Sequence, residues 1–376
     1  MKKLSAMLLA GVMAVTALTG CGKANTGYTS ENTKFVIGAT GPLTGDASSY
    51  GVSVQNGAKL AMKQVNEAGG LNGIEFDFVI KDDKATAADA ATGYDTLYES
   101  GMQASLGSVT SGSCDSFASK AVEDNVFVLT PSASAANVIE NRDNAFRVCF
   151  GDPDQGTLAA EELTKEFKNI GAIYDTSDAY SSGIYKAFDE KMKELGVEYN
   201  TQTFDAENKK DFTTQVKALK DCDVIFLPIY YTEAGLIAKS VTAAESGALL
   251  FGCDGLDGIA DQIDSSVKNT IKYITPFDVN SADESVKSFV DAYKAEYNEE
   301  PDQFAADGYD AFMAIYNAMK KADIKDVKIS ASDLCDQLVS VFTSSDFKYT
   351  GATGDMTWDK SGACNKKPQI VTLESK

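Results

Sequence analysis

The feature that most constrains the fold is a regular alternation of short apolar runs with longer segments whose apolar residues recur at helical spacing. After residue 33, strands are expected at 35–38, 76–80, 104–109 and 126–130, and helices at 52–68, 85–100 and 113–124. Strands separated by helices in this way form βαβ units, and such units build parallel sheets. This part of the chain is therefore predicted to be α/β.

A second series of the same kind follows a break at Phe150-Gly151-Asp152-Pro153. Its expected strands are 170–174, 224–227, 249–252 and 271–275, and its expected helices are 158–167, 182–195 and 232–245. A long helical stretch is expected from 284 to 322, followed by a glycine-rich pair of short strands that holds Trp358. The pattern predicts two open, doubly wound parallel sheets, whose ligands bind beyond the carboxyl ends of the strands.

The composition excludes several classes of function. Lys and Arg number 34 against 55 Asp and Glu, a net charge of −21, which argues against nucleic acid and anionic lipid as partners. The chain has no histidine and therefore lacks the commonest general base and metal ligand. The sequences GxSxG, GxGxxG and GxxxxGK[ST] are also absent. We expect a binding protein, not an enzyme, with no cofactor and no metal.

The N-terminus has the pattern of an export signal. Lys2 and Lys3 precede an apolar run over 4–18, which is too short for a permanent membrane span. The run ends in Leu18-Thr19-Gly20-Cys21, which resembles the lipobox of bacterial lipoproteins; an ordinary signal peptide with an incidental cysteine is the alternative. The resemblance implies a signal peptide over 1–20, a diacylglycerol on Cys21 and a polar tether over 21–33. We expect an extracytoplasmic protein anchored to the membrane by its N-terminal lipid.

Six further cysteines remain in the exported chain, and none forms a CxxC pair. An even number permits disulfides, but many pairings are possible and the sequence does not choose among them. Buried thiols are the alternative, which we favour for the cysteines beside or inside expected strands, Cys222 and Cys253. The six are Cys114, Cys149, Cys222, Cys253, Cys335 and Cys364.

Three loops after expected strands carry candidate binding groups. In the loop 107–113, Thr110 and Ser111 offer hydroxyls at the start of a helix, a setting suited to a carboxylate; a plain helix cap at Ser113 is the alternative. In the loop 130–135, Ser134 offers a hydroxyl, although a hydrophilic turn is the better explanation from the local sequence alone. Asp254 is suited to hold an ammonium group, and an Asp-Gly turn with no role in binding is an equally good alternative from the local sequence.

Tyrosines recur in similar positions, at Tyr50, Tyr180 and the pair Tyr230-Tyr231. Their aromatic faces and polar tips suit a small ligand with an apolar body, although any single tyrosine is more often a surface or core residue.

Many of these stretches together resemble one family. In chain order they are 37–45, 50–51, 56–58, 65–66, 69–73, 107–113, 130–134, 147, 154–156 and 307–311. They resemble the leucine/isoleucine/valine-binding proteins, which have the type I periplasmic-binding-protein fold and serve ABC transporters. The resemblance implies two lobes joined by a hinge, the Venus-flytrap architecture. The expected first lobe covers 34–152 plus 278–360, and the second covers 153–277 plus 361–376.

The resemblance also assigns roles to the polar candidates. Ser111 matches a hydroxyl that holds the α-carboxylate of the ligand, and Ser134 matches a residue that contacts both carboxylate and ammonium. Asp254 matches the acidic residue that faces the ammonium. The implied ligand is a small amino acid with a branched or otherwise apolar side chain.

The remaining family positions are aromatic. Tyr50, Tyr180 and Tyr230 match residues around the ligand, with Tyr231 as the alternative to Tyr230, and Phe277 is expected to line the side-chain pocket. The implied partners are the permease subunits of an ABC importer, and a monomer is expected. An amide, urea-like or aromatic-acid ligand, or a role as the sensing partner of a signalling protein, remain the alternatives.

Overall fold

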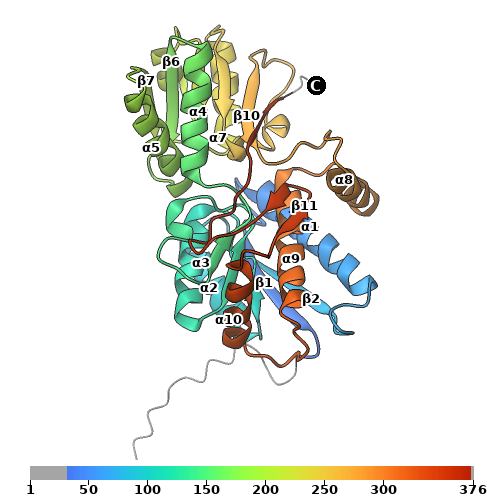
Figure 1. Ribbon diagram of the computed structural model, residues 1–376. Helices are drawn as coiled ribbons and strands as arrows, with labels where there is room; N and C mark the ends of the chain where they lie inside the picture. The colour runs from blue at the N-terminus through green and yellow to red at the C-terminus, as the bar shows by residue number, and fades with distance from the viewer. Residues whose placement is uncertain (1–31, 374–376) are drawn as a thin grey trace, which may run out of the picture.

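The computed structural model describes residues 32–373 and contains two α/β lobes, each built on its own sheet (Figure 1). The sheet of the first lobe is parallel and has the strand order β2-β1-β3-β4-β5. Its strands are β1 (Phe35–Gly41), β2 (Phe76–Asp82), β3 (Ala104–Ser105), β4 (Phe127–Thr130) and β5 (Ala145–Arg147).

Helices from two distant parts of the chain complete the first lobe. They are α1 (Ser48–Glu67), α2 (Ala87–Glu99), α3 (Ser111–Asp124), α8 (Glu284–Tyr297), α9 (Gln303–Lys321) and α10 (Ala331–Phe342). Phe35, Phe76 and Phe127 from the strands form one buried cluster with Phe312 of α9 and Phe342 of α10. The late helices therefore complete a hydrophobic core that the first strands begin.

The sheet of the second lobe has the order β13-β10-β9-β8-β6-β7, and β13 alone is antiparallel to its neighbour in it. Its strands are β6 (Ile170–Asp175), β7 (Asn200–Phe204), β8 (Val224–Leu227), β9 (Leu249–Gly252), β10 (Ile271–Thr275) and β13 (Gln369–Thr372). Its helices are α4 (Asp152–Glu166), α5 (Ala179–Glu194), α6 (Thr213–Ala218) and α7 (Tyr231–Ala243). The chain changes lobe after β5, after β10 and before β13.

The expected doubly wound α/β architecture is confirmed, but the expected continuous helix over 284–322 is wrong. The chain leaves α8 at Asn298, whose φ of 56° lies in the left-handed region, and Pro301 follows. Asp302 then starts α9 by accepting a hydrogen bond from the backbone N–H of Ala305 at 2.8 Å. A left-handed residue and a proline end one helix, and a carboxylate cap begins the next.

Several elements have no counterpart in the sequence prediction: β5, β7, α6, α10 and β13. The strand β7 is a polar edge strand whose residues are mostly half-buried or exposed, so it lacks an apolar run. The expected strand pair is confirmed as β11 (Tyr349–Gly351) and β12 (Gly354–Met356). Trp358 lies just beyond this hairpin and packs in the first lobe against Phe342 and Phe347.

The expected lobe boundaries stay a prediction, although each sheet draws its strands from the expected parts of the chain. All six cysteines of residues 32–373 are buried free thiols. Within the same residues no helix is both long and apolar enough to cross a bilayer. The signal peptide over 1–20, Cys21 and most of the tether lie outside the described residues.

Candidate ligand-binding site

A small cavity lies between the two lobes and brings together five of the seven candidate residues. Its open space is about 240 Å³ but leaves only about 10 Å³ accessible to the centres of water molecules, and we call it the inner cavity. Tyr50 and Ser111 reach it from the first lobe, and Tyr180, Tyr230 and Asp254 reach it from the second. The full lining is Tyr50, Val109, Thr110, Ser111, Ser132, Tyr180, Tyr230, Asp254, Gly255 and Phe304.

Free hydroxyls at the start of α3 form the first-lobe wall. Thr110 is the N-cap residue of α3, yet its side chain makes no capping hydrogen bond, and its buried Oγ1 has no partner. The buried Oγ of Ser113 is also unpartnered, so a plain cap at Ser113 does not explain this loop. Ser111 Oγ accepts a hydrogen bond from the backbone N–H of Ala135 at 3.2 Å. Hydroxyls and helix amides directed at one place make a site for an anion.

A buried carboxyl group forms the opposite wall. Asp254, 2% exposed, follows β9, and its Oδ1 accepts hydrogen bonds from Tyr180 Oη at 2.7 Å and Gln155 Nε2 at 3.0 Å. Gln155 also accepts a hydrogen bond from the Asp254 backbone N–H at 3.0 Å, which fixes the loop. Burial raises the pKa of Asp254 to about 6, against the opposing effect of these hydrogen bonds. Above that pH, the cavity presents a desolvated negative charge.

Tyrosine rings fill the space between these two polar walls. The rings of Tyr180 and Tyr230 stack with centroids 4.9 Å apart, and Tyr50 meets Tyr230 edge-on at 5.6 Å. Tyr50 also joins the lobes, because its hydroxyl donates to the carbonyl of Gly255 at 2.5 Å and accepts from the Tyr231 backbone N–H at 3.2 Å. Tyr230 lines the inner cavity, whereas Tyr231 packs edge-on against Tyr50 at 4.8 Å.

Ser134 and Phe277 do not line the inner cavity. Ser134 is fully buried, its Oγ has no partner, and its carbonyl accepts hydrogen bonds from the guanidinium of Arg147 and the backbone N–H of Asp152. Phe277 packs in the separate cluster of α8 and α9, with its ring 6.0 Å from that of Phe289.

Phe304 lines the inner cavity instead, and the sequence analysis did not single it out. Its ring lies 4.1 Å from that of Tyr50, because α9 packs closely against α1. The sequence around Phe304 signals only the start of a helix, so no local pattern predicts this contact. Gln155 is the other functional group that was missed, although it lies in a stretch that resembles the family.

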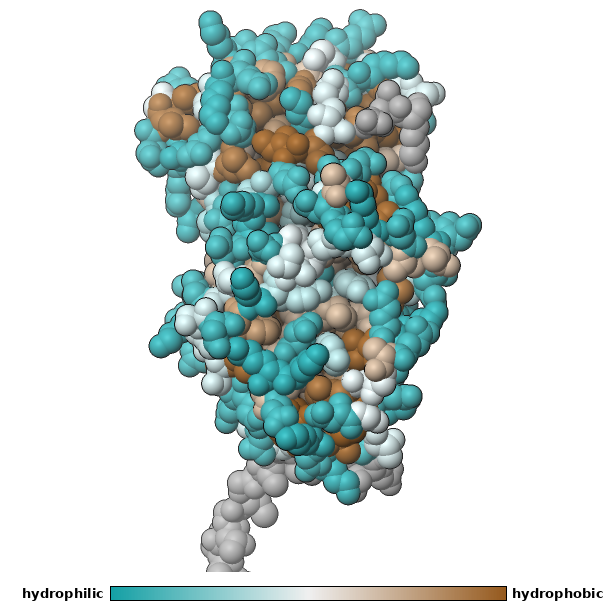
Figure 2. Space-filling view, turned by 45° about the vertical axis from the view of Figure 1, so that its right-hand side comes forward, coloured by the Kyte–Doolittle hydropathy of each residue, from teal (hydrophilic) through white to brown (hydrophobic). Residues whose placement is uncertain are grey.

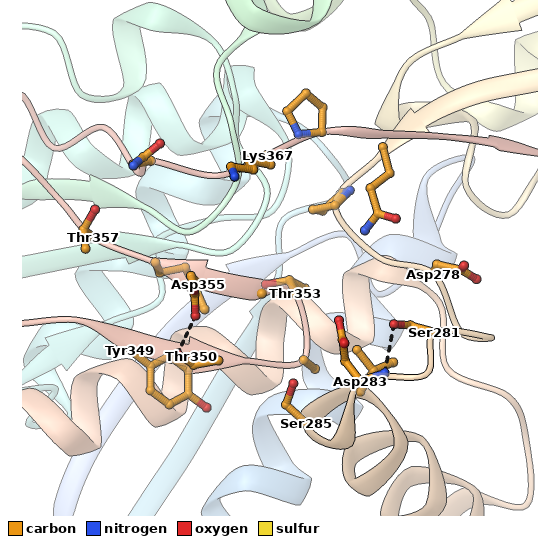
Figure 3. Close-up of a pocket in the computed structure, with 18 of the residues that line it drawn as sticks. Asp278, Ser281, Asp283, Ser285, Tyr349, Thr350, Thr353, Asp355, Thr357 and Lys367 are labelled. Atoms are coloured by element: carbon orange, nitrogen blue, oxygen red, sulfur yellow. Dashed lines mark hydrogen bonds between the residues drawn. The ribbon is translucent and has the colours of Figure 1, made fainter.

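A larger groove lies elsewhere on the molecule and holds none of the candidate residues (Figure 3). Its open space of about 1510 Å³ lies between the β11–β12 hairpin, the start of α8 and the segments that join the lobes. Ser281, Ser285, Thr350 and Thr353 make its lining strongly hydroxylated. The surface in Figure 2 is likewise mainly hydrophilic, with hydrophobic side chains in separate places.

The inner cavity therefore offers an anion site on one lobe, a carboxylate on the other and aromatic faces between them. Within residues 32–373, no group of three His, Cys, Asp or Glu residues is arranged to hold a metal ion. The chemistry is complementary to a small dipolar molecule that contacts both lobes at once.

Fold and cavity together define a two-lobed protein with a cavity lined by residues of both lobes. The model of the family described as periplasmic binding protein matches residues 34–369, nearly the whole chain. The chain belongs to this family, as its resemblance predicted. Membership places it outside the cytoplasm, among the binding proteins of ABC transporters and not among enzymes.

Individual relatives agree with this assignment. The Leu/Ile/Val-binding protein homolog 1 of Brucella suis is 26% identical over 336 residues, covering 87% of this chain and 86% of that protein. The branched-chain amino acid transporter substrate-binding protein LivJ of Streptococcus pneumoniae, solved with isoleucine, is 29% identical. It covers 90% of this chain and 100% of its own, with a TM-score of 0.77.

The same fold also holds other ligands. A solute-binding protein of an ABC transporter from R. palustris, solved with benzoate, has a TM-score of 0.79 at 19% identity, covering 90% of this chain and 92% of its own. At that identity the likeness concerns the fold alone, so the ligand of this chain follows from its own residues.

Proposed function

We propose that this protein is a receptor for a branched-chain or other apolar α-amino acid, which it delivers to an ABC importer. One observation carries the proposal: the buried carboxyl group of Asp254 and the hydroxyl-rich start of α3 line one cavity from opposite lobes. An α-amino acid has an ammonium for the first and a carboxylate for the second. The aromatic rings of Tyr50, Tyr180 and Phe304 then contact its side chain.

The energetics favour strict recognition of the charged head and looser recognition of the side chain. A hydrogen bond to a charged group contributes about 1.5–3 kcal/mol, and leaving one member of a buried ion pair alone costs about 3–5 kcal/mol. Each buried methylene contributes only about 0.8 kcal/mol. We therefore expect leucine, isoleucine and valine to bind with affinities within about tenfold of one another.

Ligand binding closes the lobes in this proposal. Ser111 belongs to the first lobe and Asp254 to the second, so a ligand that contacts both binds the closed form better and shifts the hinge equilibrium. The closed form is what the permease subunits recognise. Cleavage before Cys21 and lipidation of its sulfur keep the receptor, as a monomer, at the membrane that holds the permease.

Replacing Asp254 tests the proposal. Thermal shift against the twenty amino acids identifies the ligand, since a ligand that binds only the folded protein raises its stability. Isothermal titration calorimetry then compares the wild type with Asp254→Asn and with the exposed Asp221→Asn as the control. We expect Asp254→Asn to weaken binding by about 3 kcal/mol, roughly a hundredfold, and Asp221→Asn to leave it unchanged. Equal affinity of the Asp254→Asn variant contradicts the assignment.

A ligand that lacks an ammonium group, such as an aromatic acid, is the second candidate, favoured by the tyrosine-lined cavity. The Asp254→Asn variant distinguishes an amino acid from an aromatic acid, because removing the Asp254 charge strengthens the binding of an aromatic acid or leaves it unchanged. Amide and urea-like ligands require that no free amino acid binds at all, whereas a sensing role differs in the partner protein and not in the ligand.

A further inference from the structure

A second space adjoins the inner cavity and also involves both lobes. We call it the outer chamber; its open space is about 980 Å³, and Tyr230 belongs to the walls of both. The first lobe contributes residues 46–47 and 84–86, and the second contributes residues that follow β6, β7 and β8. Two lysines, Lys84 and Lys209, lie in this lining.

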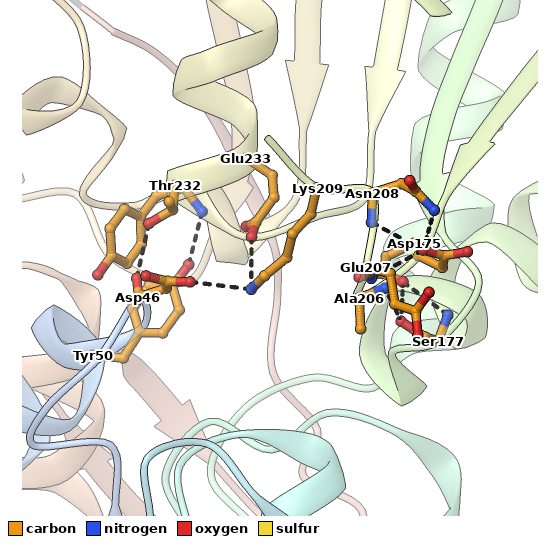
Figure 4. A network of polar contacts seen from close by, with 12 residues as sticks. Asp46, Tyr50, Asp175, Ser177, Ala206, Glu207, Asn208, Lys209, Thr232 and Glu233 are labelled. Carbon is orange, nitrogen blue, oxygen red and sulfur yellow. Dashed lines mark hydrogen bonds and ion pairs between the residues drawn. The ribbon is translucent and has the colours of Figure 1, made fainter. Parts of the chain in front are cut away.

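Lys209 bridges the lobes across this chamber (Figure 4). Its Nζ lies 3.2 Å from Oδ2 of Asp46, just before α1 in the first lobe, and 3.2 Å from Oε1 of Glu233, on α7 in the second. Thr232, also on α7, donates a hydrogen bond to the carbonyl of Asp46 at 2.8 Å. Asp46 is therefore held to the second lobe through both its side chain and its backbone.

Glu233 is the buried member of this bridge, and the cation of Lys209 lies between it and the more exposed Asp46. The Glu233 side chain is only 9% exposed, against 31% for Lys209 and 65% for Asp46. Burial raises the pKa of Glu233, while the charge of Lys209 acts in the opposite direction. Without Lys209, the carboxylates of Asp46 and Glu233 would face each other across the interface and repel. Lys209 converts this repulsion between the lobes into attraction.

We propose that Lys209 is a positioning residue for ligand binding, which stabilises the closed arrangement of the lobes without contacting the ligand. It does not line the inner cavity, so its effect on affinity comes through the hinge equilibrium. The effect on affinity rests on the proposed function. The effect on closure does not, because the bridge forms between protein groups alone.

Lys84 provides a matched control within the same chamber. Its Nζ lies 3.3 Å from Oδ2 of Asp89, which belongs to the same lobe. This ion pair therefore does not link the two lobes. Replacing either lysine by methionine removes one positive charge from the lining. If the chamber were an electrostatic subsite for part of the ligand, both replacements would change affinity. If Lys209 acts as a bridge, only its replacement changes lobe closure.

The experiment measures closure and affinity separately in Lys209→Met, Lys209→Arg and Lys84→Met. Small-angle X-ray scattering and the distance between spin labels on the two lobes report closure in the ligand-free protein, and calorimetry with L-isoleucine reports affinity. We expect Lys209→Met to lower the closed fraction of the ligand-free protein and to weaken binding about two- to fivefold, the range for a partly exposed ion pair. Lys209→Arg should restore both properties, and Lys84→Met should resemble the wild type.

Two results would overturn the proposal. The first is a Lys209→Met protein whose ligand-free label distances equal those of the wild type. The second is a Lys84→Met protein that loses affinity as much as Lys209→Met does, which would make the chamber a ligand subsite. If no variant binds L-isoleucine, the proposed function fails while the closure measurements still decide the role of Lys209.

Discussion

Two properties of Asp254 act on its pKa in opposite directions: it is buried, and it accepts hydrogen bonds that favour its charged form. Burial is the larger effect and raises the pKa of its carboxyl to about 6 from an ordinary value of 3.8. Between these values the folded protein binds more protons than the unfolded chain. The stability that this group contributes in its protonated form is lost as the pH rises through about 6.

Ligand affinity should therefore depend on pH in the opposite direction. An ammonium group interacts with the ionised carboxylate, so protonation of Asp254 competes with binding below pH 6. The tyrosines that face it, Tyr50, Tyr180 and Tyr230, have pKa values raised by burial and stay neutral. The neighbouring acids Asp152 and Asp257 have raised pKa values for the same reason.

We predict that amino-acid affinity is about tenfold weaker at pH 5 than at pH 7.5, and that binding near pH 6 releases part of a proton. Calorimetry in two buffers of different ionisation enthalpy measures both quantities. The residual binding of Asp254→Asn should not vary over this range. A wild-type affinity that is constant from pH 5 to pH 7.5 would assign the ammonium to another group.

For individual residues, the sequence predicts the polar groups of the candidate site better than it predicts the packing contacts of apolar side chains. Thr110 and Ser111 follow a strand of the first sheet and Asp254 follows a strand of the second, so the topology places each group beyond the carboxyl end of a strand in its own lobe. Phe304 reaches the cavity only because α9 packs on α1, and Phe277 turns toward α8 for a similar reason. Such packing depends on three-dimensional neighbours that no local pattern specifies.

Among the elements, those with apolar periodicity or clear apolar runs were predictable, and polar or interrupted ones were not. The strands β1, β4, β8 and β9 are apolar and lie where expected. The edge strand β7, with the sequence NTQTF, has no such run. The expected helix over 284–322 ignored Pro301, although a proline restricts the residue before it and removes a backbone donor.

The packing of α1 on α9 leads to a prediction about Gly57. A Cβ atom at Gly57 would overlap the carbonyl oxygen of Ala305, so the close approach of the two helices depends on this residue being glycine. We expect Gly57→Ala to separate the helices and lower the free energy of unfolding by about 2–3 kcal/mol. Phe304 and Tyr50 should shift with them and weaken ligand binding.

Gly112 supplies the control for this replacement. It also lies in a helix, α3, but a Cβ atom there would meet nothing within 4 Å. Gly112→Ala should therefore raise the free energy of unfolding by about 0.5–1 kcal/mol, because alanine favours helix. Urea unfolding followed by circular dichroism measures both variants. Equal stability of the Gly57→Ala and Gly112→Ala proteins would mean that the packing of α1 on α9 can accommodate a Cβ atom at position 57.

At the scale of the whole molecule, the first and the last of the three segments that join the lobes are tied to each other. Trp358 donates a hydrogen bond from Nε1 to the carbonyl of Arg147 at 2.7 Å, just before the first of these segments. The guanidinium of Arg147 donates a hydrogen bond to the carbonyl of Ser134. Movement of the first segment should therefore change the environment of Trp358, and its fluorescence is a suitable reporter of closure.

The last of the joining segments is held by a buried lysine. The Lys366 side chain is 1% exposed, its Nζ lies 3.6 Å from Oδ1 of Asp307, and it donates a hydrogen bond to Thr353. Asp310 accepts hydrogen bonds from the backbone N–H and the hydroxyl of the same Thr353. Burial raises the pKa of both Asp307 and Asp310, and the charge of Lys366 opposes that effect. One cation thus stabilises two buried acids of α9.

We predict that Lys366→Met lowers the free energy of unfolding by about 3–5 kcal/mol, because it leaves Asp307 buried without a counter-charge. Its neighbour Lys367 is exposed, so Lys367→Met makes the same chemical change and should alter stability by less than about 0.5 kcal/mol. Adding Asp307→Asn to Lys366→Met should recover part of the loss, since it removes the uncompensated charge. Urea unfolding monitored by Trp358 fluorescence compares the three proteins. If Lys366→Met is as stable as Lys367→Met, packing alone holds the segment before β13, and the lobes need no buried charge at their junction.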